Sequence, residues 1–307
     1  MKVIQHAREL QPGNKRVCLA IGFFDGVHLG HQQIIRQTIA DARQHEGLSL
    51  VITFDNHPNT VVAPERVPEL IYPLSQKVQT IDSLGADSLL LVHFDRAFSQ
   101  LTGEAFIRTL AHDLVHVRSI CVGTNFTFGH KRAGNVELLR SLGTGLGFVV
   151  HAVAAVSLDG RAVSSTRIRE AVAAGDLDAA SQMLGRSYSL SGKVLRGDGL
   201  GRKLGFPTAN LDTTGLVLPP IGVYAVHAEL EGQLHRAVLN IGYRPTVHVA
   251  QPQLRVEAHL LDFSGDLYGQ PLSLIFVGKL RDERKFDSLA ELQSQIARDI
   301  SAARELF

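Results

Sequence analysis

Two histidines in a glycine-rich segment are the first residues whose types and spacing could do chemistry. The segment at residues 22–31 reads GFFDGVHLGH and lies where an apolar run gives way to a helical pattern. His28 and His31 are three residues apart, so on the first turn of a helix both imidazoles project to one side. Backbone N–H groups at a helix start favour an anion there, and glycines let the main chain approach a phosphate closely. We therefore interpret the segment as a phosphate site whose imidazoles stabilise charge that grows in a transition state.

Two other interpretations of this segment are a packed histidine pair in a tight turn and a zinc pair. The zinc interpretation lacks a cysteine, a glutamate or a third histidine at a suitable spacing nearby. The strand-to-helix setting favours a ligand site, because open parallel sheets bind ligands at the carboxyl ends of their strands. Besides the histidines, the candidate ATP and phosphate contacts in this segment are Gly22, Phe24, Asp25, Gly26 and Gly30.

Three further segments follow predicted strands and are expected at the same edge of the sheet. Residues 163–169 read VSSTRIR and open a helix, where hydroxyls often serve only as caps. Combined with the histidine segment, a second helix start that carries arginines could clamp a triphosphate. The other two segments, at residues 53–58 and 123–129, follow the second and fourth strands. The candidate residues in these segments are Ser164, Ser165, Arg167, Arg169, His57 and Asn125.

The second half of the chain carries a glycine-rich segment of another kind. Residues 197–210 read GDGLGRKLGFPTAN and lack the Walker pattern, but their backbone N–H groups could still wrap a nucleotide. Thr208 and Asn210 offer neutral oxygen ligands suited to a Mg²⁺ ion that keeps several waters. Further candidate phosphate contacts are Gly201, Lys203 and Gly205. The alternative is a flexible surface loop.

Glu257 lies on a predicted strand at residues 256–263. Alternation places its side chain on the same face as His259. A carboxylate near a barrel mouth could deprotonate an alcohol that attacks a γ-phosphate. The alternative for Glu257 is an acidic residue on the exposed face of a strand.

The elements that position these residues change in kind along the chain. Short apolar runs at residues 16–24, 48–54, 88–92, 119–122 and 148–156 alternate with helical patterns at 32–45, 76–84 and 135–142. This alternation predicts a parallel sheet with helices on its faces. Closely spaced strands at 189–195, 222–230, 233–241, 253–261 and 270–279, followed by a helix at 287–306, predict an antiparallel barrel. We therefore divide the chain into domains at 1–185 and 186–307.

Composition excludes several classes of protein. The chain has 307 residues, of which 45% are hydrophobic, so it can bury a core. Its 31 basic and 30 acidic residues include no basic block, which disfavours a nucleic-acid partner. Cys18 and Cys121 lie in apolar runs and form no disulfide framework, which favours a cytoplasmic location. We find no signal peptide and no membrane-spanning stretch. The sequence does not decide between a monomer and a homo-oligomer.

The motifs of the first half resemble a known family. GFFDGVHLGH is similar to the His-x-Gly-His signature of nucleotidyltransferases, which have a Rossmann-like fold. With the SSTRIR segment it looks like the adenylyltransferase module of bacterial bifunctional riboflavin kinase/FAD synthetases. The resemblance implies that His28, His31, Ser164 and Ser165 handle the ATP phosphates, that Arg167 or Arg169 contributes, and that His57 and Asn125 lie near the flavin. One departure is Asn56, which stands where the family often has proline.

The second half resembles the riboflavin kinase module of the same family. LGFPTANL at residues 204–211 is similar to its Pro-Thr-Ala-Asn motif, and segments at 222–225, 240–246, 256–263 and 266–269 follow in family order. The resemblance implies a six-stranded barrel, Thr208 and Asn210 at Mg-ATP, and Glu257 as the base. It also implies that Arg281 and the final helix lie near the flavin. Residues 247–249 depart from the family, which often has glycines there.

Together the two resemblances predict a bifunctional enzyme of flavin cofactor biosynthesis. The second half would convert riboflavin and ATP to FMN, and the first half would convert FMN and ATP to FAD and pyrophosphate. One alternative is a different nucleotidyltransferase, such as one acting on pantetheine phosphate, and the barrel half argues against it. Another is a flavin-binding regulatory protein with inactive sites, and the complete set of candidate catalytic and metal residues argues against that.

Overall fold

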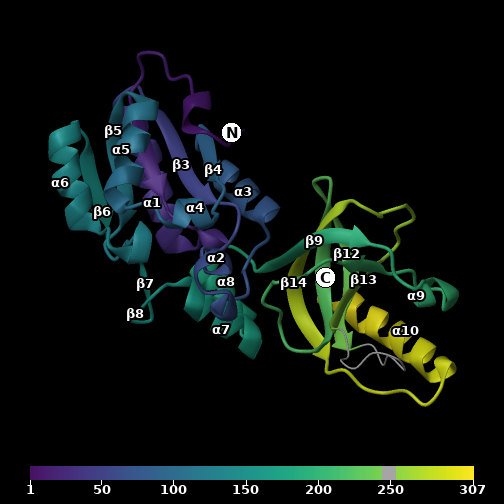
Figure 1. The fold of residues 1–307 in the computed structure, drawn as a ribbon. Helices are drawn as coiled ribbons and strands as arrows, with labels where there is room; N and C mark the ends of the chain where they lie inside the picture. Colours follow the sequence, from purple (N-terminus) through teal and green to yellow (C-terminus); the bar gives the residue numbers. More distant parts are fainter. Residues whose placement is uncertain (244–253) are drawn as a thin grey trace. The chain divides into compact units, whose positions relative to one another are not determined.

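The computed structural model describes residues 1–243 and 254–307. The chain forms two compact units, one made of residues 1–69 and 74–165 and the other of residues 70–73 and 166–307 (Figure 1). The change of unit falls at the start of helix α7 (Ser165–Ala174). The predicted domain boundary after residue 185 follows helix α8 (Leu177–Leu184), which ends at Gly185 in the left-handed region with φ 68°. The division at residue 185 stays a prediction.

The first unit is built on the predicted parallel sheet, which has six strands because a short strand at Lys2–Ile4 joins the five predicted ones. Its strand order is β1-β4-β3-β2-β5-β6. The strands are β1 (Lys2–Ile4), β2 (Val17–Ile21), β3 (Leu48–Phe54), β4 (Ser88–Val92), β5 (Val117–Gly123) and β6 (Val149–Val153). Every residue of the central strand β2 is buried. Both faces are covered by helices, which is why the strands read as continuous apolar runs.

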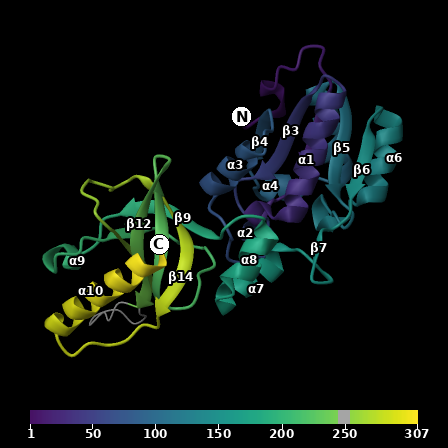
Figure 2. The same cartoon turned by 180° about the vertical axis from the view of Figure 1, so that it is seen from behind.

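Four helices cover the sheet. Helices α1 (Leu29–Gln44) and α3 (Leu74–Ser83) pack on one face, where Ile35 and Ile81 share a core cluster with Val51 (Figure 2). Helices α5 (Gly103–Leu114) and α6 (Val136–Leu146) pack on the other, where Leu110 and Leu139 join a second cluster (Figure 1). Shorter elements are α2 (Asn59–Val62), α4 (Arg96–Ser99), the 3-10 turns η1 (Ala7–Glu9), η2 (Asp25–Val27), η3 (Pro64–Arg66) and η4 (His130–Arg132), and the hairpin of β7 (Ser157–Leu158) and β8 (Arg161–Ala162).

The sheet has a point at which the chain changes the side on which it adds new strands. After β2 the chain adds β3 and β4 on one side, and it then returns to add β5 and β6 on the other side of β2. The loops that follow β2 and β5 therefore diverge, and such a switch point is where open α/β sheets bind ligands. The histidine segment follows β2 and lies at this point.

The second unit contains the predicted antiparallel barrel. Its six strands close in the order β10-β13-β12-β11-β14-β9. They are β9 (Ser189–Leu195), β10 (Ala209–Leu211), β11 (Gly222–Leu230), β12 (Gln233–Tyr243), β13 (Leu254–Leu260) and β14 (Pro271–Arg281). Helix α10 (Leu289–Leu306) packs outside the barrel, where Ala303 joins a cluster with Val223 and Val238. The six strands implied by the family resemblance are confirmed. Residues 244–249 and position 253 of the fourth predicted barrel strand, at 253–261, lie outside the described residues.

The two cysteines are neighbours in the sheet although they are far apart in sequence. Cys18 pairs with Ser119 and Cys121 pairs with Ala20 on the adjacent strands β2 and β5. Both thiols are free, as predicted, and both are fully buried. Burial raises the pKa of Cys18 to about 11 and that of Cys121 to about 12. The thiolate that reacts with electrophiles is therefore scarce at neutral pH.

We expect both thiols to resist modification in the folded protein. A chromogenic aromatic disulfide should label neither cysteine under native conditions and both in denaturant, as counted by absorbance. Rapid labelling of either thiol in folded protein would contradict the burial.

No helix among the residues that the structure describes is long and apolar enough to cross a membrane.

Candidate active sites

The histidine segment forms a tight left-handed turn between β2 and α1. Phe24, Gly26 and Val27 have φ values of 54°, 73° and 41°. His28 is the N-cap of α1, and its Nδ1 accepts the backbone N–H of His31 at 3.4 Å. The two imidazoles stack with their centroids 3.6 Å apart and their planes at 20°. The expectation that both rings project to one side is thus confirmed.

The two imidazoles differ in their surroundings. His28 is 6% exposed, and His31 is partly exposed. Burial, followed by the charges of His28 and Lys77, holds the pKa of His31 well below its usual value. His31 is therefore neutral at neutral pH, and a neutral imidazole has one N–H to donate and one nitrogen to accept. Within the described residues, the Nδ1 atom of His31 is buried and has no hydrogen-bond partner.

The glycines of the turn leave no room for a side chain. A Cβ on Gly22 would lie 2.8 Å from the ring of Phe24, and one on Gly30 would lie 3.3 Å from the His28 ring. Phe24 is 1% exposed and packs edge-to-face on His31 at 5.3 Å. The two glycines therefore let the rings of Phe24 and His28 lie close against the main chain.

Two of the other predicted segments meet the histidine turn. Ser165 at the start of α7 donates from Oγ to the carbonyl of Asp25 at 3.1 Å, and Asp25 is itself buried. His57, in the loop after β3, packs edge-to-face on Phe23 with centroids 4.8 Å apart. The backbone N–H of Asn59 donates to His57 Nδ1 at 3.0 Å. Chain segments far apart in sequence thus converge on one turn.

Asn125 is a predicted residue that the structure does not bring to this turn. Asn125 is exposed in the loop after β5, and within the described part of the chain no hydrogen bond or ring contact joins it to the histidines. Ser164 directly precedes α7 and is partly exposed. Arg167 and Arg169 follow in the first turns of α7 and belong to the second unit.

Lys77 is a residue of this site that the sequence analysis missed. It lies on α3, is 4% exposed, and its Nζ donates to the carbonyls of Phe54 at 2.8 Å and Phe23 at 3.2 Å. A third bond goes to Thr53 Oγ1 at 3.3 Å. Lys77 precedes the buried Ile81 by one helical turn. A lysine on the apolar face of a predicted helix was the signal that could have identified it.

The second group of candidate residues lies across three neighbouring barrel strands. Asn210 of β10 pairs with Glu257 of β13, and Glu257 pairs in turn with Asn240 of β12. Paired residues project to the same face, and their Cβ atoms are about 4.5–5.5 Å apart. The neighbours of Glu257 in its strand, Val256 and Ala258, point into the barrel core. Glu257 therefore lies on the outer wall, between two amides.

Asn240 was also missed as a site residue. It opens the segment 240–246 that resembles the family, but a single polar residue on the outer face of a strand is common and marks no site by itself. Only the strand register places it beside Glu257.

The glycine-rich segment lies against Thr208 and Asn210. A Cβ on Gly197 would clash with the Asn210 side chain, and one on Gly201 would lie 3.2 Å from Thr208 Oγ1. The segment contains the short helix α9 (Leu200–Lys203), and Lys203 at its end is exposed. Gly205 follows with φ 87°, in the left-handed region. The segment is thus built closely around the two predicted metal ligands.

Two arginines of this unit make ion pairs, and one of them lies beside Glu257. Arg255 pairs through Nη1 with Asp198 of the glycine-rich segment at 2.7 Å, and the same atom lies 3.9 Å from Glu257 Oε1. Arg281 makes a two-pronged pair with Asp299 of α10 at 2.9 and 2.7 Å. The guanidinium of Arg281 thus anchors the final helix to the end of β14.

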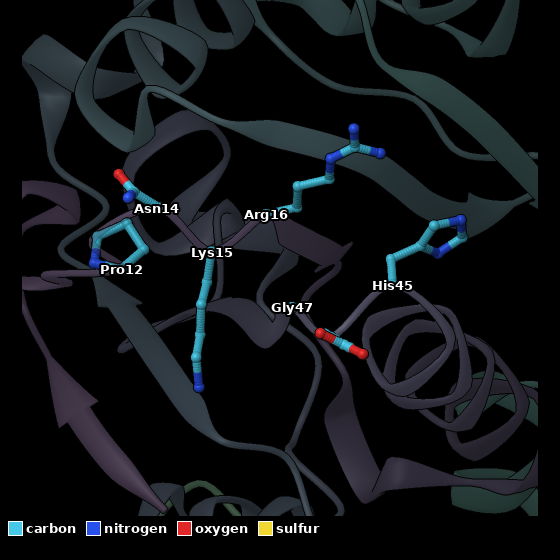
Figure 3. A pocket seen from close by; sticks show the side chains of 7 residues that line it. Pro12, Asn14, Lys15, Arg16, His45 and Gly47 are labelled. Carbon is cyan, nitrogen blue, oxygen red and sulfur yellow. The ribbon is translucent and has the colours of Figure 1, made fainter.

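A hollow of about 720 Å³ lies elsewhere on the first unit (Figure 3). Arg16 directly precedes β2, and Gly47 directly precedes β3, so the hollow is at the amino ends of these strands. The histidine turn lies at the carboxyl end of β2. None of the predicted site residues lines this hollow, which is lined by Pro12, Asn14, Lys15, Arg16, His45, Glu46 and Gly47.

The fold and the two residue groups define a class of protein, a transferase that combines a nucleotidyltransferase-type sheet with a kinase-type barrel. Comparison with family models agrees with this class. Residues 10–167 match the FAD synthetase family, and residues 184–307 match the riboflavin kinase family.

The chain belongs to the bifunctional riboflavin kinase/FMN adenylyltransferase family. It is 38% identical over 306 residues to the enzyme of that description from Pseudomonas fluorescens, covering 100% of this chain and 98% of the relative. It is 37% identical over 294 residues to the one from Bacillus subtilis, covering 94% and 92%. It is thus a transferase that phosphorylates riboflavin to FMN and adenylylates FMN to FAD, with ATP as the co-substrate of both reactions.

One solved structure is similar over nearly the whole chain. It is a protein from Streptococcus pneumoniae described as a macrolide-efflux protein, with a TM-score of 0.81 and 28% identity, and the match covers 99% of each chain. The similarity supports the fold, while the efflux description belongs to that protein alone.

Proposed function

We propose that the two reactions use the two residue groups separately, FAD formation at the histidine turn and FMN formation at Glu257. The observation that carries this assignment is the line Asn210–Glu257–Asn240 on the outer barrel wall, which lies in a different unit from the stacked histidines. A carboxylate between two amides and beside a glycine-rich segment suits phosphoryl transfer to an alcohol.

In FAD formation, a phosphate oxygen of FMN attacks the α-phosphorus of ATP. The bond from that phosphorus to the bridging oxygen of the β-phosphate breaks, and pyrophosphate leaves. Because the nucleophile is already ionised, no general base is needed. His28 and His31 act by positioning and by donating hydrogen bonds to phosphate oxygens as negative charge grows. The neutral state of His31 provides such a donor.

Other residues complete the adenylyl transfer site. The phosphate pocket would be shaped by the glycines of the turn, the buried Asp25 and the serine pair. Ser165 Oγ donates a hydrogen bond to the carbonyl of Asp25, which joins the serine pair to the turn. We assign ATP contacts to Gly22, Phe24, Asp25, Gly26, Gly30, Ser164, Ser165, Arg167 and Arg169, and flavin contacts to His57 and Asn125.

In FMN formation, Glu257 accepts the proton of the ribityl hydroxyl as that oxygen attacks the γ-phosphorus. The bond from the γ-phosphorus to the bridging oxygen breaks, and ADP leaves. Arg255 Nη1 lies 3.9 Å from Glu257 Oε1 and places a positive charge beside this carboxylate. Gly201, Lys203 and Gly205 would contact the ATP phosphates, and we assign a flavin contact to Arg281.

Thr208 and Asn210 fit a magnesium ion. Both offer neutral oxygens, and the glycine-rich segment comes so close to them that a Cβ on Gly197 or Gly201 would contact their side chains. Among the described residues no group of three or more acidic, histidine or cysteine side chains could hold a metal, and Mg²⁺ does not need one because phosphates and waters supply its other ligands. When bound, the ion would neutralise charge on the transferring phosphoryl group.

Asn210→Ala should raise the Mg²⁺ concentration needed for half-maximal FMN formation by about tenfold. The reason is that the loss of one oxygen ligand weakens binding of the ion, and a tenfold change corresponds to about 1.4 kcal/mol. A magnesium titration of riboflavin phosphorylation measures the effect, and FAD formation by the same variant is the control. An unchanged magnesium requirement would remove Asn210 from the metal site.

The overall function is tested by mixing the purified protein with riboflavin and Mg-ATP and separating the flavins by chromatography. We expect FMN first and FAD later, with ADP and pyrophosphate as co-products. AMP transfer to a different acceptor, with no FAD formed, would contradict the proposal.

The cytoplasmic location stays a prediction from the cysteines, and the absence of a nucleic-acid partner stays a prediction from the near-neutral charge. The choice between a monomer and a homo-oligomer stays open.

A further inference from the structure

Lys77 is a buried ammonium whose donors are all used within the described structure. An ammonium has three N–H groups. They reach the carbonyl of Phe23, in the loop after β2, and Thr53 Oγ1 and the carbonyl of Phe54, at the end of β3. The Nζ atom also lies 4.4 Å from the centre of the Phe23 ring. All three bonds form only when the ends of the two strands are held side by side.

This hydrogen bonding does not neutralise the charge. In the described part of the chain no carboxylate forms an ion pair with Lys77. Asp25 of the histidine turn and Asp55 after β3 act on it from a longer distance and raise its pKa, but burial outweighs them and lowers the pKa to about 8. A buried cation without an ion-pair partner costs stability that an apolar side chain of similar length would avoid.

The charge of Lys77 also acts on the histidine pair. It is one of the causes of the lowered pKa of His31, together with burial and His28. The charged groups that act on Lys77 are Asp25 of the turn and Asp55 of the β3 loop, and Lys77 acts in turn on His31 of α1. A positive charge behind the histidine pair suits a site that gathers the phosphates of two anionic substrates.

We propose that Lys77 is a positioning residue for FAD formation, which joins the loops after β2 and β3 and holds a positive charge behind the histidine pair. The inference rests on the assignment of adenylyl transfer to the histidine turn. It explains why a site of this kind keeps a buried lysine on the apolar face of α3, where packing alone would be served by methionine. Anionic substrates would supply the neutralising charge that the protein lacks.

The test compares Lys77→Met, Lys77→Arg and the exposed control Lys15→Met. Lys77→Met should lower kcat for FAD formation by about 10- to 100-fold, because loosened loops misplace the reacting groups. FMN formation by the same variant should not change, which shows that the barrel unit remains folded. Lys15→Met should leave both reactions unchanged, since Lys15 is exposed.

A pH profile separates charge from packing. In the unmodified protein, kcat/KM for ATP in FAD formation should fall as the pH rises through about 8, because deprotonation removes the charge on Lys77. Arginine does not deprotonate in this range, so Lys77→Arg should abolish this alkaline fall. In Lys77→Met the pKa of His31, followed by its ring proton NMR signal, should rise because a nearby positive charge is gone.

The proposal is overturned if Lys77→Met forms FAD at the normal rate, or if Lys77→Arg keeps the alkaline fall near pH 8. Should Lys77→Met not fold, the profile of Lys77→Arg alone decides. If the assignment of FAD formation to the histidine turn is itself wrong, the results differ from these. The unmodified protein would then form no FAD from supplied FMN, or His28→Ala would leave FAD formation intact.

Discussion

His28→Ala is expected to lower kcat for FAD formation by about 10²–10³-fold and to leave FMN formation unchanged. The reason is that removal of one preorganised donor to developing charge costs about 2.7–4 kcal/mol in comparable sites. His28 stacks on His31 at 3.6 Å, so its loss also removes the support for the second ring. The rates are measured separately, with FMN and ATP for one reaction and riboflavin and ATP for the other.

A second variant distinguishes chemistry from helix capping. His28 caps α1 by accepting the His31 N–H, and loss of a cap costs about 1 kcal/mol of stability. His28→Asn keeps a side-chain acceptor at the cap but has no imidazole. We expect it to be as inactive as His28→Ala in FAD formation, and the exposed control His116→Ala to be fully active. Normal FAD formation by His28→Asn would show that His28 only caps the helix.

Glu257→Gln should lower the rate of FMN formation by about 10²–10⁴-fold, which is the usual contribution of a general base. FAD formation from supplied FMN should be unaffected. Glutamine keeps the size and strand pairing of Glu257 but cannot take up the hydroxyl proton. The matched control is Glu229→Gln, because Glu229 is an exposed acid on β11 of the same barrel.

The two sets of variants together test the assignment of separate sites. Loss of both activities in either Glu257→Gln or His28→Ala, with the protein still folded by circular dichroism, would show that the residue groups do not serve separate reactions. Retention of FMN formation in Glu257→Gln would show that Glu257 is an outer-wall acid without a catalytic role.

Local sequence patterns located most strands well. Strand β3 has the predicted ends, because Gly47 and Asp55 interrupt the apolar run on both sides. The first predicted strand continued to residue 24, but β2 ends at Ile21. The apolar Phe24 adopts φ 54° in the turn instead and is buried there, since a residue in the left-handed region cannot continue a strand.

Several elements were not predicted, among them strand β1, helix α5 and strand β10. Helix α5 has an N-cap at Thr102 and buried residues Phe106, Leu110 and Leu114 at helical spacing, so its pattern was present but was not used. Strand β10 has only three residues and lies within a segment interpreted as a loop. Its strand character comes from pairing with β9 and β13, which no local pattern reveals.

The sequence by itself determined the two motif sets, their order along the chain and the classes of their frameworks, because residue type, spacing and periodicity are local properties. Only the tertiary structure decided which side chains share a site. The register of β12 and β13 places Asn240 beside Glu257, and the packing of α3 places Lys77 under the histidine turn. Both depend on contacts between distant segments, whose geometry is set by burial and strand pairing across the whole unit.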